Sequence, residues 1–465
     1  MKNNLFALGF ITIALLAHGK SPDKTGIDSD MLTRLKASYT LDASTKAIRN
    51  ALHTNEIDRL AVNADNRNNF DDNFSLKVPS KGITDQESSG RCWLFTGLNV
   101  LRAQMMAQND MEKIELSQNY NFFFDQLEKS NLFLQGIIDT ASKPMDDQFV
   151  SWLFQHPLSD GGQYTGLSDN ILKYGVVPKS VMEETQSSAS TSKMNRIISL
   201  KLREDGLELR KMAQNGATSG QLASRKEEML ETIYRILALT LGEPPTQFTW
   251  THKDSKGNIV SVKEYTPVSF YQEFLGNDLK NDYVMLMNDP SREYYRLYQI
   301  DFDRHTYDGQ NWTYVNLPVE EIKEMAIKSI KDSTMMYFSC DVGKYYDRQR
   351  GLLDIDNFDY ESLFGTKFGM DKADRIRTFA SASSHAMTLM AVDLDKDGKP
   401  IKWMVENSWG PGANDGHLIM TDRWFDEYMF RLVVNKKYLN DNIAEILKQK
   451  PVTLPAWDPM FSPEQ

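Results

Sequence analysis

A cysteine at the expected start of a helix is the first residue of this sequence that could carry chemistry. Cys92, one of only two cysteines, follows a turn at residues 88–91 and opens an apolar run whose spacing predicts a helix from Cys92 to Ala107. The positive end of a helix favours an anion, so a cysteine there is biased toward the nucleophilic thiolate. A buried hydrophobe at the start of a core helix would give the same pattern, so Cys92 needs partners before it indicates catalysis.

Partners of suitable type follow in order along the chain. His385 lies 293 residues after Cys92, at the mouth of an apolar strand, and Asn407 follows 22 residues later, past the return strand of an expected hairpin. The Asn407 amide oxygen could accept a hydrogen bond from the imidazole while Trp409 shields that bond, so the roles mirror those of a Ser-His-Asp triad. Gln86 could donate a side-chain N–H to a developing oxyanion. Together these residues predict a cysteine nucleophile with a base, an orienting amide and an oxyanion donor.

The other histidines and the second cysteine are expected to play no part in the reaction. His53, His252 and His305 lie among polar residues and are expected to be solvated, and His156 precedes a proline in a loop. Cys340 lies in an expected buried strand, where it would only pack.

A possible calcium motif is explained better by a turn. The aspartates at 393, 395 and 397, followed by Gly398, match the first half of an EF-hand loop. Position twelve of that loop would be Met404 instead of a bidentate Glu, and strands instead of helices flank it. We therefore expect a hairpin turn, with no metal or other cofactor.

Composition limits the classes of protein to consider. The chain has 465 residues, 41% hydrophobic and 25% charged, which is ordinary for a globular protein. Its net charge of −11 weighs against nucleic-acid binding.

Residues 1–19 are typical of an export signal, with Lys2, an apolar core at 5–17 and small residues up to Gly19. That core is too short to span a membrane, so we expect export to the periplasm or beyond, with a cytoplasmic location as the alternative.

Periodicity predicts helices first and a sheet last, with an insertion between them, which favours an α+β fold. Ser117 is placed to cap the second helix. The expected helices span residues 92–107, 118–130, 145–154, 193–214, 221–241 and 320–331, and the expected strands span residues 248–252, 259–265, 335–341, 387–392, 403–405, 418–420 and 432–434.

The sequence resembles the papain-type cysteine peptidases, and within them the bleomycin hydrolase and aminopeptidase C branch. The resemblance is carried by Gln86, by residues 90–93, and by the stretches 384–387 and 406–410. Further similar stretches are residues 115–118, 160–163, 174–179, 340–344, 393–400 and 454–460. The interval between Cys92 and His385 exceeds the roughly 130 to 150 residues of the simplest papain-like enzymes, and the surplus coincides with the expected insertion.

The resemblance implies a papain-like fold, made of a helical half and a β-barrel-like half with a largely helical insertion. It assigns Cys92 as nucleophile, His385 as base and then acid, Asn407 as orienting residue, Gln86 as oxyanion donor, Gly161 and Gly162 as substrate-binding residues, and Gln465 as the source of a carboxylate for the substrate's amino group. The expected divisions are an export signal at 1–19, an arm at 20–60, the helical half at 61–190, the insertion with oligomer contacts at 191–320, the β half at 321–450 and a tail in the cleft at 451–465.

The function implied is that of a cysteine aminopeptidase acting on peptides with a free amino terminus, in a closed six-fold assembly and without a membrane partner. The tail at 461–465 departs from the family's short ending of small residues. An endopeptidase or amide hydrolase with the same fold therefore stays open as an alternative. A third possibility is a catalytically idle oligomeric binding protein, against which the intact set of catalytic residue types weighs.

Overall fold

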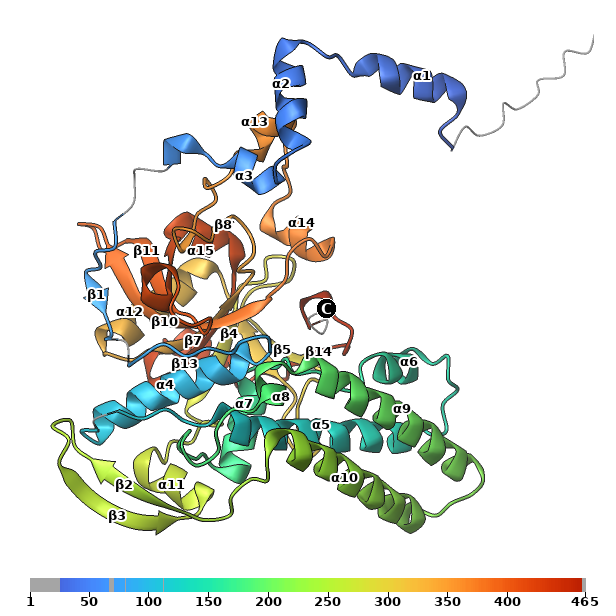
Figure 1. Ribbon diagram of the computed structural model, residues 1–465, viewed down its shortest axis with the longest axis vertical. Coiled ribbons are helices and arrows are strands. Elements are labelled where there is room, and N and C mark those ends of the chain that lie inside the picture. The colour runs from blue at the N-terminus through green and yellow to red at the C-terminus, as the bar shows by residue number, and fades with distance from the viewer. Residues whose placement is uncertain (1–25, 67–70, 80, 112, 462–465) are drawn as a thin grey trace, which may run out of the picture.

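The computed structural model describes residues 26–66, 71–79, 81–111 and 113–461. The expected export signal at 1–19 and the terminal Gln465 lie outside these residues. Figure 1 shows a helical half and a sheet half that meet along one helix, α4 (Cys92–Gln108). This separation of helices from the sheet is that of an α+β fold, as the sequence predicted.

The central helix α4 is buried because it lies between the two halves. It packs against β10 (His385–Leu394) on the sheet side, and against α5 (Gln118–Asp139) and α7 (Tyr164–Tyr174) on the helical side. Its buried residues lie on all sides of the helix, which is the pattern of a helix inside a core. The first residue of α4, Cys92, consequently lies at the junction of the halves.

The helical half is built on α5. The predicted N-cap Ser117 is confirmed, since its side chain accepts a hydrogen bond from the Tyr120 N–H. Two long helices, α9 (Ser192–Gln214) and α10 (Ser219–Leu241), form the predicted hairpin and pack on α5. Shorter helices complete this half: α6 (Gln148–Gln155), α8 (Gln186–Ala189) and α11 (Pro267–Phe274).

The sheet half holds one sheet of 12 strands among the described residues. Most of its neighbouring strands are antiparallel; β4 with β6, β5 with β14 and β9 with β12 run parallel. Across the sheet, the order is β14 (Val452–Leu454), β5 (Arg296–Ile300), β6 (Thr313–Asn316), β4 (Tyr283–Met287), β13 (Met429–Asn435), β7 (Met336–Cys340), β10, β11 (Pro400–Glu406), β12 (His417–Thr421), β9 (Leu352–Leu353) and β8 (Tyr346–Asp347), with β1 (Leu76–Lys77) paired to β10.

The segment expected to form the insertion, 191–320, divides into two parts. Residues 192–274 form α9, α10, α11 and a separate hairpin of β2 (Phe248–Lys253) and β3 (Ile259–Tyr265). The strands β4, β5 and β6, between residues 283 and 316, pair with β13 and β14 in the main sheet. Their short, buried apolar runs could not be assigned to a sheet from the sequence, because strand pairing is a long-range property.

The predicted hairpin in the sheet half is present. It is formed by Thr388 to Leu394 of β10 and by the return strand β11. The Asp395 side chain holds its turn by accepting hydrogen bonds from the N–H groups of Asp397 and Lys399. The possible calcium loop is therefore a β-turn.

The remaining helices are α12 (Val319–Lys331), α13 (Tyr360–Phe364), α14 (Lys372–Arg377), α15 (Asp422–Tyr428), α16 (Asp441–Ile446) and the 3-10 turns η1 (Ala64–Asn66), η2 (Ala413–Gly416), η3 (Lys436–Tyr438) and η4 (Pro459–Phe461).

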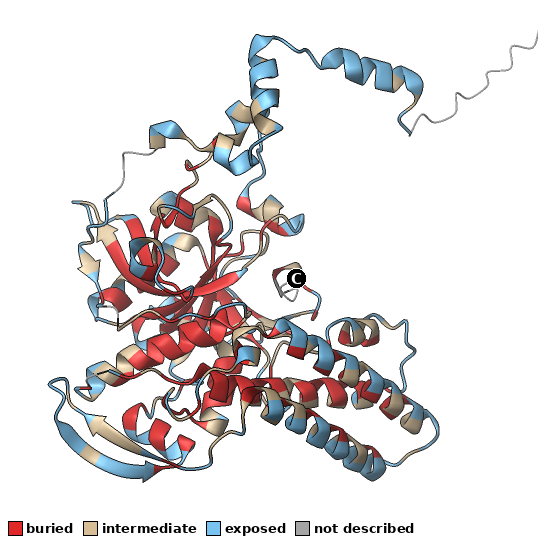
Figure 2. Cartoon of the chain, in the orientation of Figure 1, coloured by how far each residue is buried: buried red, intermediate tan, exposed pale blue. Residues whose placement is uncertain are grey.

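The amino-terminal arm extends away from both halves, as Figures 1 and 2 show. Its first two helices, α1 (Ser29–Ser38) and α2 (Ala43–Leu52), contain no buried residue, and α3 (Ile57–Ala61) contacts α13. Several large apolar side chains of the arm are exposed, namely those of Ile27, Leu32, Leu35, Tyr39, Leu41 and Ile48. Within the described residues, no helix combines the length and hydropathy needed to cross a membrane.

Candidate active site

The turn before Cys92 is fixed by the loop that carries the two expected substrate-binding glycines. The Gly90 N–H donates to the Asp160 carboxylate at 2.7 Å, and the Trp93 indole N–H donates to the Asp160 carbonyl at 2.9 Å. A Cβ at Gly90 would lie 2.6 Å from the Asp160 carboxylate, so only glycine allows this approach. The loop and the start of α4 are thereby held together, with Cys92 buried at the first helical position.

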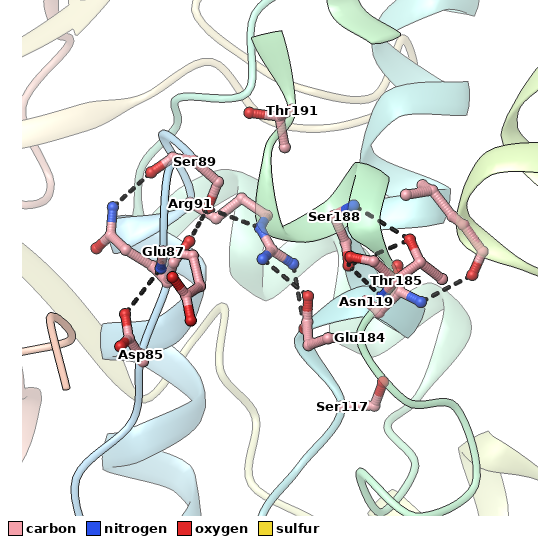
Figure 3. A network of polar contacts seen from close by, with 12 residues as sticks. Asp85, Glu87, Ser89, Arg91, Ser117, Asn119, Glu184, Thr185, Ser188 and Thr191 are labelled. Carbon is pink, nitrogen blue, oxygen red and sulfur yellow. Dashed lines mark hydrogen bonds and ion pairs between the residues drawn. The ribbon is translucent and has the colours of Figure 1, made fainter. Parts of the chain in front are cut away.

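Arg91 supports the same turn from inside the protein. Its guanidinium is buried and forms an ion pair with Glu184 at 2.8 Å, while its Nε donates to the Ser89 hydroxyl at 3.0 Å. Figure 3 shows Arg91 between these two partners. Arginine suits this position because its rigid fork of donors can satisfy both partners at once. The sequence alone gave no sign of this role for Arg91, because its main partner, Glu184, is 93 residues away in the chain.

His385 and Asn407 are brought together by the β10–β11 hairpin. The His385 Nε2–H donates to the Asn407 side-chain oxygen at 2.8 Å. Trp409 stacks on the imidazole, with ring centroids 4.6 Å apart, and covers this hydrogen bond. Burial lowers the pKa of His385 to about 4, although the bond to Asn407 acts in the opposite direction. With Nε2 protonated, the ring presents Nδ1 as a proton acceptor.

Gln86 is hydrogen-bonded to Ser408, the residue that follows Asn407. Its backbone N–H donates to the Ser408 carbonyl at 2.8 Å, and the Ser408 hydroxyl donates to the Gln86 side-chain oxygen at 2.7 Å. This fixes the amide orientation, so that Nε2 supplies the donors. One of its two N–H groups is used, because Nε2 donates to the Ser89 carbonyl at 2.6 Å. The structure thus places Gln86 beside the catalytic candidates, with one N–H accounted for locally.

Gly161 and Gly162 form one wall of a cavity of about 180 Å³. This volume is many times what one water molecule needs, so the cavity has room for a side chain. The lysine Lys129 donates to the Gly161 carbonyl at 2.6 Å and so fixes the loop. A Cβ on Gly162 would lie 2.3 Å from the His305 ring and 2.8 Å from the Trp93 ring. The cavity therefore begins next to Trp93, one residue from Cys92.

The expectation that His305 is solvated was wrong. His305 is buried, and its Nδ1 lies 2.6 Å from a carboxylate oxygen of Asp125, which also pairs with Lys129 at 2.9 Å. Its ring meets Trp93 edge to face, with centroids 5.0 Å apart. The polar neighbours of His305 in the sequence gave no sign of this, since Asp125 lies 180 residues away. His305 supports the floor beneath Gly162.

Cys340 lies directly opposite His385 in the pairing of β7 with β10. Both cysteines are free thiols and both are buried. Burial raises the pKa of Cys340 well above its usual value, and the charge of Asp341 acts in the same direction. Cys340 is therefore a neutral thiol that packs under the site, as the sequence predicted.

The described part of the carboxy-terminal tail reaches the same cavity. Ala456 and Met460 contribute to its wall, and the Met460 carbonyl accepts from the Arg431 guanidinium at 3.0 Å. Gln465 lies outside the described residues, so its expected position is not described. Among the residues that are described, no cluster of three or more His, Cys, Asp or Glu side chains is suited to hold a metal ion.

The fold and this constellation define a papain-like peptidase, and the chain belongs to the Peptidase C1-like family, whose sequence model matches residues 26–461. It is 40% identical over 399 residues to the bleomycin hydrolase of Rattus norvegicus, covering 83% of this chain and 88% of the relative. It is 37% identical over 417 residues to the aminopeptidase C of Lactobacillus delbrueckii subsp. lactis, covering 88% and 92%. The crystal structure of PepW from Lactobacillus rhamnosis superposes with a TM-score of 0.90 at 38% identity, covering 94% of this chain and 99% of that one.

Proposed function

We propose that this protein is a cysteine aminopeptidase that hydrolyses peptides from a free amino terminus. The observation that carries the proposal is the hydrogen bond between His385 and Asn407. His385 begins β10, which packs against α4, and α4 begins with Cys92. Relatives over most of the chain are named bleomycin hydrolase and aminopeptidase C. The first name is that of a hydrolase and the second that of an aminopeptidase, and both agree with the proposal.

The mechanism follows from the protonation states. Because burial lowers the pKa of His385 to about 4, its imidazole is neutral at pH 7 and can accept the Cys92 proton at Nδ1. The thiolate formed then stabilises the imidazolium as a nearby opposite charge. Attack on the substrate carbonyl forms the carbon–sulfur bond, and His385 returns its proton to the leaving amine as the carbon–nitrogen bond breaks. Water then hydrolyses the thioester, with His385 again acting as the base.

The developing oxyanion needs donors that are already oriented. The Gln86 amide has one N–H beyond the bond to the Ser89 carbonyl, and its orientation is fixed by Ser408. The backbone N–H of Cys92, at the first position of α4, is the second donor we assign. Gly161, which is half-buried, and Gly162, which is exposed, offer backbone along which the substrate chain can lie. The tail carboxylate, from Gln465 or from an earlier residue after trimming, is assigned to the substrate's ammonium.

Replacing the nucleophile tests this proposal. We expect Cys92→Ala to abolish the release of the amino acid from unblocked aminoacyl amides, because no other described thiol is placed to attack. Cys340→Ala is the matched control, since it removes a buried thiol on the neighbouring strand and should leave most of the turnover. Turnover retained by Cys92→Ala would refute the proposal.

The endopeptidase alternative is favoured by one feature, the divergent ending at residues 461–465. It predicts efficient cleavage of amino-blocked peptides, whereas the aminopeptidase requires a free amine. Comparing one peptide in its free and acetylated forms separates the two functions.

For assembly we propose a homo-oligomer, six-fold by family resemblance. The exposed apolar residues of α1, α2, α9 and α10 support this assignment, because faces of this kind become buried when copies associate. For localisation we propose export after cleavage near Gly19. An amino terminus at Met1 in the protein isolated from its cells would refute export.

A further inference from the structure

A buried ion pair joins the two halves of the protein away from the catalytic candidates. Arg102, ten residues after Cys92 in α4, donates to the Glu406 carboxylate at 3.0 Å, and both side chains are buried. Glu406 is the last residue of β11 and directly precedes Asn407. The helix that begins with the candidate nucleophile is thereby bonded to the strand that presents the orienting amide.

Arg102 also holds the segment at 82–86, which ends with the candidate oxyanion donor. Its guanidinium donates to the Gly82 carbonyl at 2.6 Å. About one turn earlier on α4, the Asn99 side-chain N–H donates to the Thr84 hydroxyl at 2.9 Å, and both of these side chains are buried. The segment is therefore bonded to α4 at two points, one of them charged.

The opposite side of this segment is bonded to the chain that follows Asn407. The Gln86 N–H donates to the Ser408 carbonyl at 2.8 Å. The Gly410 N–H donates to the Thr84 carbonyl at 3.1 Å. The segment thus lies between α4 and the chain after β11, so the three parts of the protein that carry the nucleophile, the oxyanion donor and the orienting amide are hydrogen-bonded side by side.

An ion pair is a costly way to join buried elements. Removing a guanidinium and a carboxylate from water costs free energy that their attraction need not return. Burial accordingly lowers the pKa of Arg102, although the charge of Glu406 acts in the opposite direction. Such a pair does constrain geometry closely, because charge-assisted hydrogen bonds are short and a guanidinium donates in fixed directions. The pair is therefore better suited to fixing the placement of α4 than to stabilising the fold.

We propose that Arg102 and Glu406 are positioning residues that set the distance between the nucleophile and its base. This inference deepens the function proposed above and rests on it. Because α4 is continuous from Cys92 to Arg102, a shift of α4 against β11 at the ion pair also moves the thiol against the imidazole. Proton transfer between these groups requires hydrogen-bond distance, and a misplacement of about 1 Å can lower a rate roughly hundredfold.

The test removes both charges at once. Arg102→Met/Glu406→Gln leaves no unpaired buried charge, so the subunit should fold. With phenylalanine 4-nitroanilide as substrate, we expect kcat to fall roughly ten- to hundredfold and KM to change little, because the loop at 159–163 is untouched. Lys201→Met/Asp205→Asn is the matched control and should keep the wild-type kcat. It removes an ion pair of 2.9 Å within α9, in which the Asp205 side chain is buried.

Alkylation of Cys92 by iodoacetamide separates positioning from stability. At pH 6 the reaction needs a thiolate formed by proton transfer to His385, so the rate constant of the double variant should fall roughly tenfold. At pH 10 a thiol ionises without a base, because the pKa of an unperturbed cysteine is about 8.5, so the variant and the wild type should react equally. A pair that only stabilised the fold would change neither rate constant in the folded protein.

Three results would overturn the inference. The first is a wild-type kcat in the double variant. The second is an equal loss of alkylation at both pH values, which would indicate hindered access to the thiol. The third is a double variant that does not fold while the control does, which would assign the pair to stability alone. Failure of the proposed function is distinguishable, because the wild-type protein would then release no 4-nitroaniline while the alkylation rates could still be compared.

Discussion

At the scale of single residues, the site depends on how burial changes the proton affinity of His385. The imidazole is covered by Trp409 and bonded to Asn407, so it exchanges little with water. An imidazolium in this position has lost its hydration and has gained only an amide as partner, which explains the direction of the pKa shift. The same burial must therefore reduce the stability of the fold in acid.

The pH dependence of stability tests this link. In the folded chain the pKa of His385 is lowered from 6.5 to about 4. Between these values the unfolded chain binds a proton that the folded chain does not, so the free energy of unfolding falls as the pH is lowered. From pH 7 to pH 5 we expect this one group to remove about 2 kcal/mol. Urea unfolding of Cys92→Ala, compared with Cys92→Ala/His385→Asn, measures the difference without interference from the thiol. Parallel losses in the two variants would contradict the shift.

At the scale of elements, the site is made by contacts between segments that are distant in sequence. The loop at 159–163 is attached to the start of α4 through Asp160, and Gly162 leaves just enough room for the rings of His305 and Trp93. Neither Gly90 nor Gly162 leaves room for an added Cβ atom, because protein interiors are packed as densely as crystals.

Adding one methyl group at Gly162 should displace the loop. For Gly162→Ala we expect the free energy of unfolding to fall by about 1 to 3 kcal/mol, because the new Cβ would overlap the His305 ring. A shift of about 1 Å in the loop should lower kcat/KM roughly hundredfold. Gly369→Ala serves as control, since a Cβ there would meet nothing within 4 Å. Wild-type kcat/KM in Gly162→Ala would show that the loop does not position the substrate.

At the scale of the whole molecule, the arm and the tail differ in how they relate to the two halves. The tail returns along β5 through β14 and ends its described course at the cavity. The arm instead leaves the body, and the apolar side chains of α1 and α2 named above are exposed (Figure 2). An isolated helix of ten residues is barely stable in water, so the proposed contacts with other copies would stabilise it.

Charges on the arm should therefore weaken assembly without unfolding the subunit. We expect Leu32→Asp/Leu35→Asp to lower the particle mass in light scattering toward that of a monomer, with the far-ultraviolet circular dichroism nearly unchanged. The control Thr33→Asp places one carboxylate on the same exposed helix outside the apolar pair. A mass equal to wild type for the double variant would remove the arm from the interface.

The sequence by itself determined the chemistry and the local structure of this protein. Cys92, His385 and Asn407 could be predicted as catalytic residues because thiol, imidazole and amide in that order match a recognisable catalytic set. The α9–α10 hairpin could be predicted because its apolar spacing is local. Residue type and short-range periodicity are properties of the chain that do not depend on distant contacts.

Only the tertiary structure decided how those residues are supported and what surrounds them. His305 was expected in solvent and is buried against Asp125, and Arg102 gave no sequence signal before it was seen beside Glu406. The sequence likewise gave no sign that β4, β5 and β6 belong to the main sheet, because their partner strands are distant in the chain. Strand pairing, burial and the polarity of a cavity arise from contacts between groups far apart in the chain. The local sequence around each group does not encode these contacts.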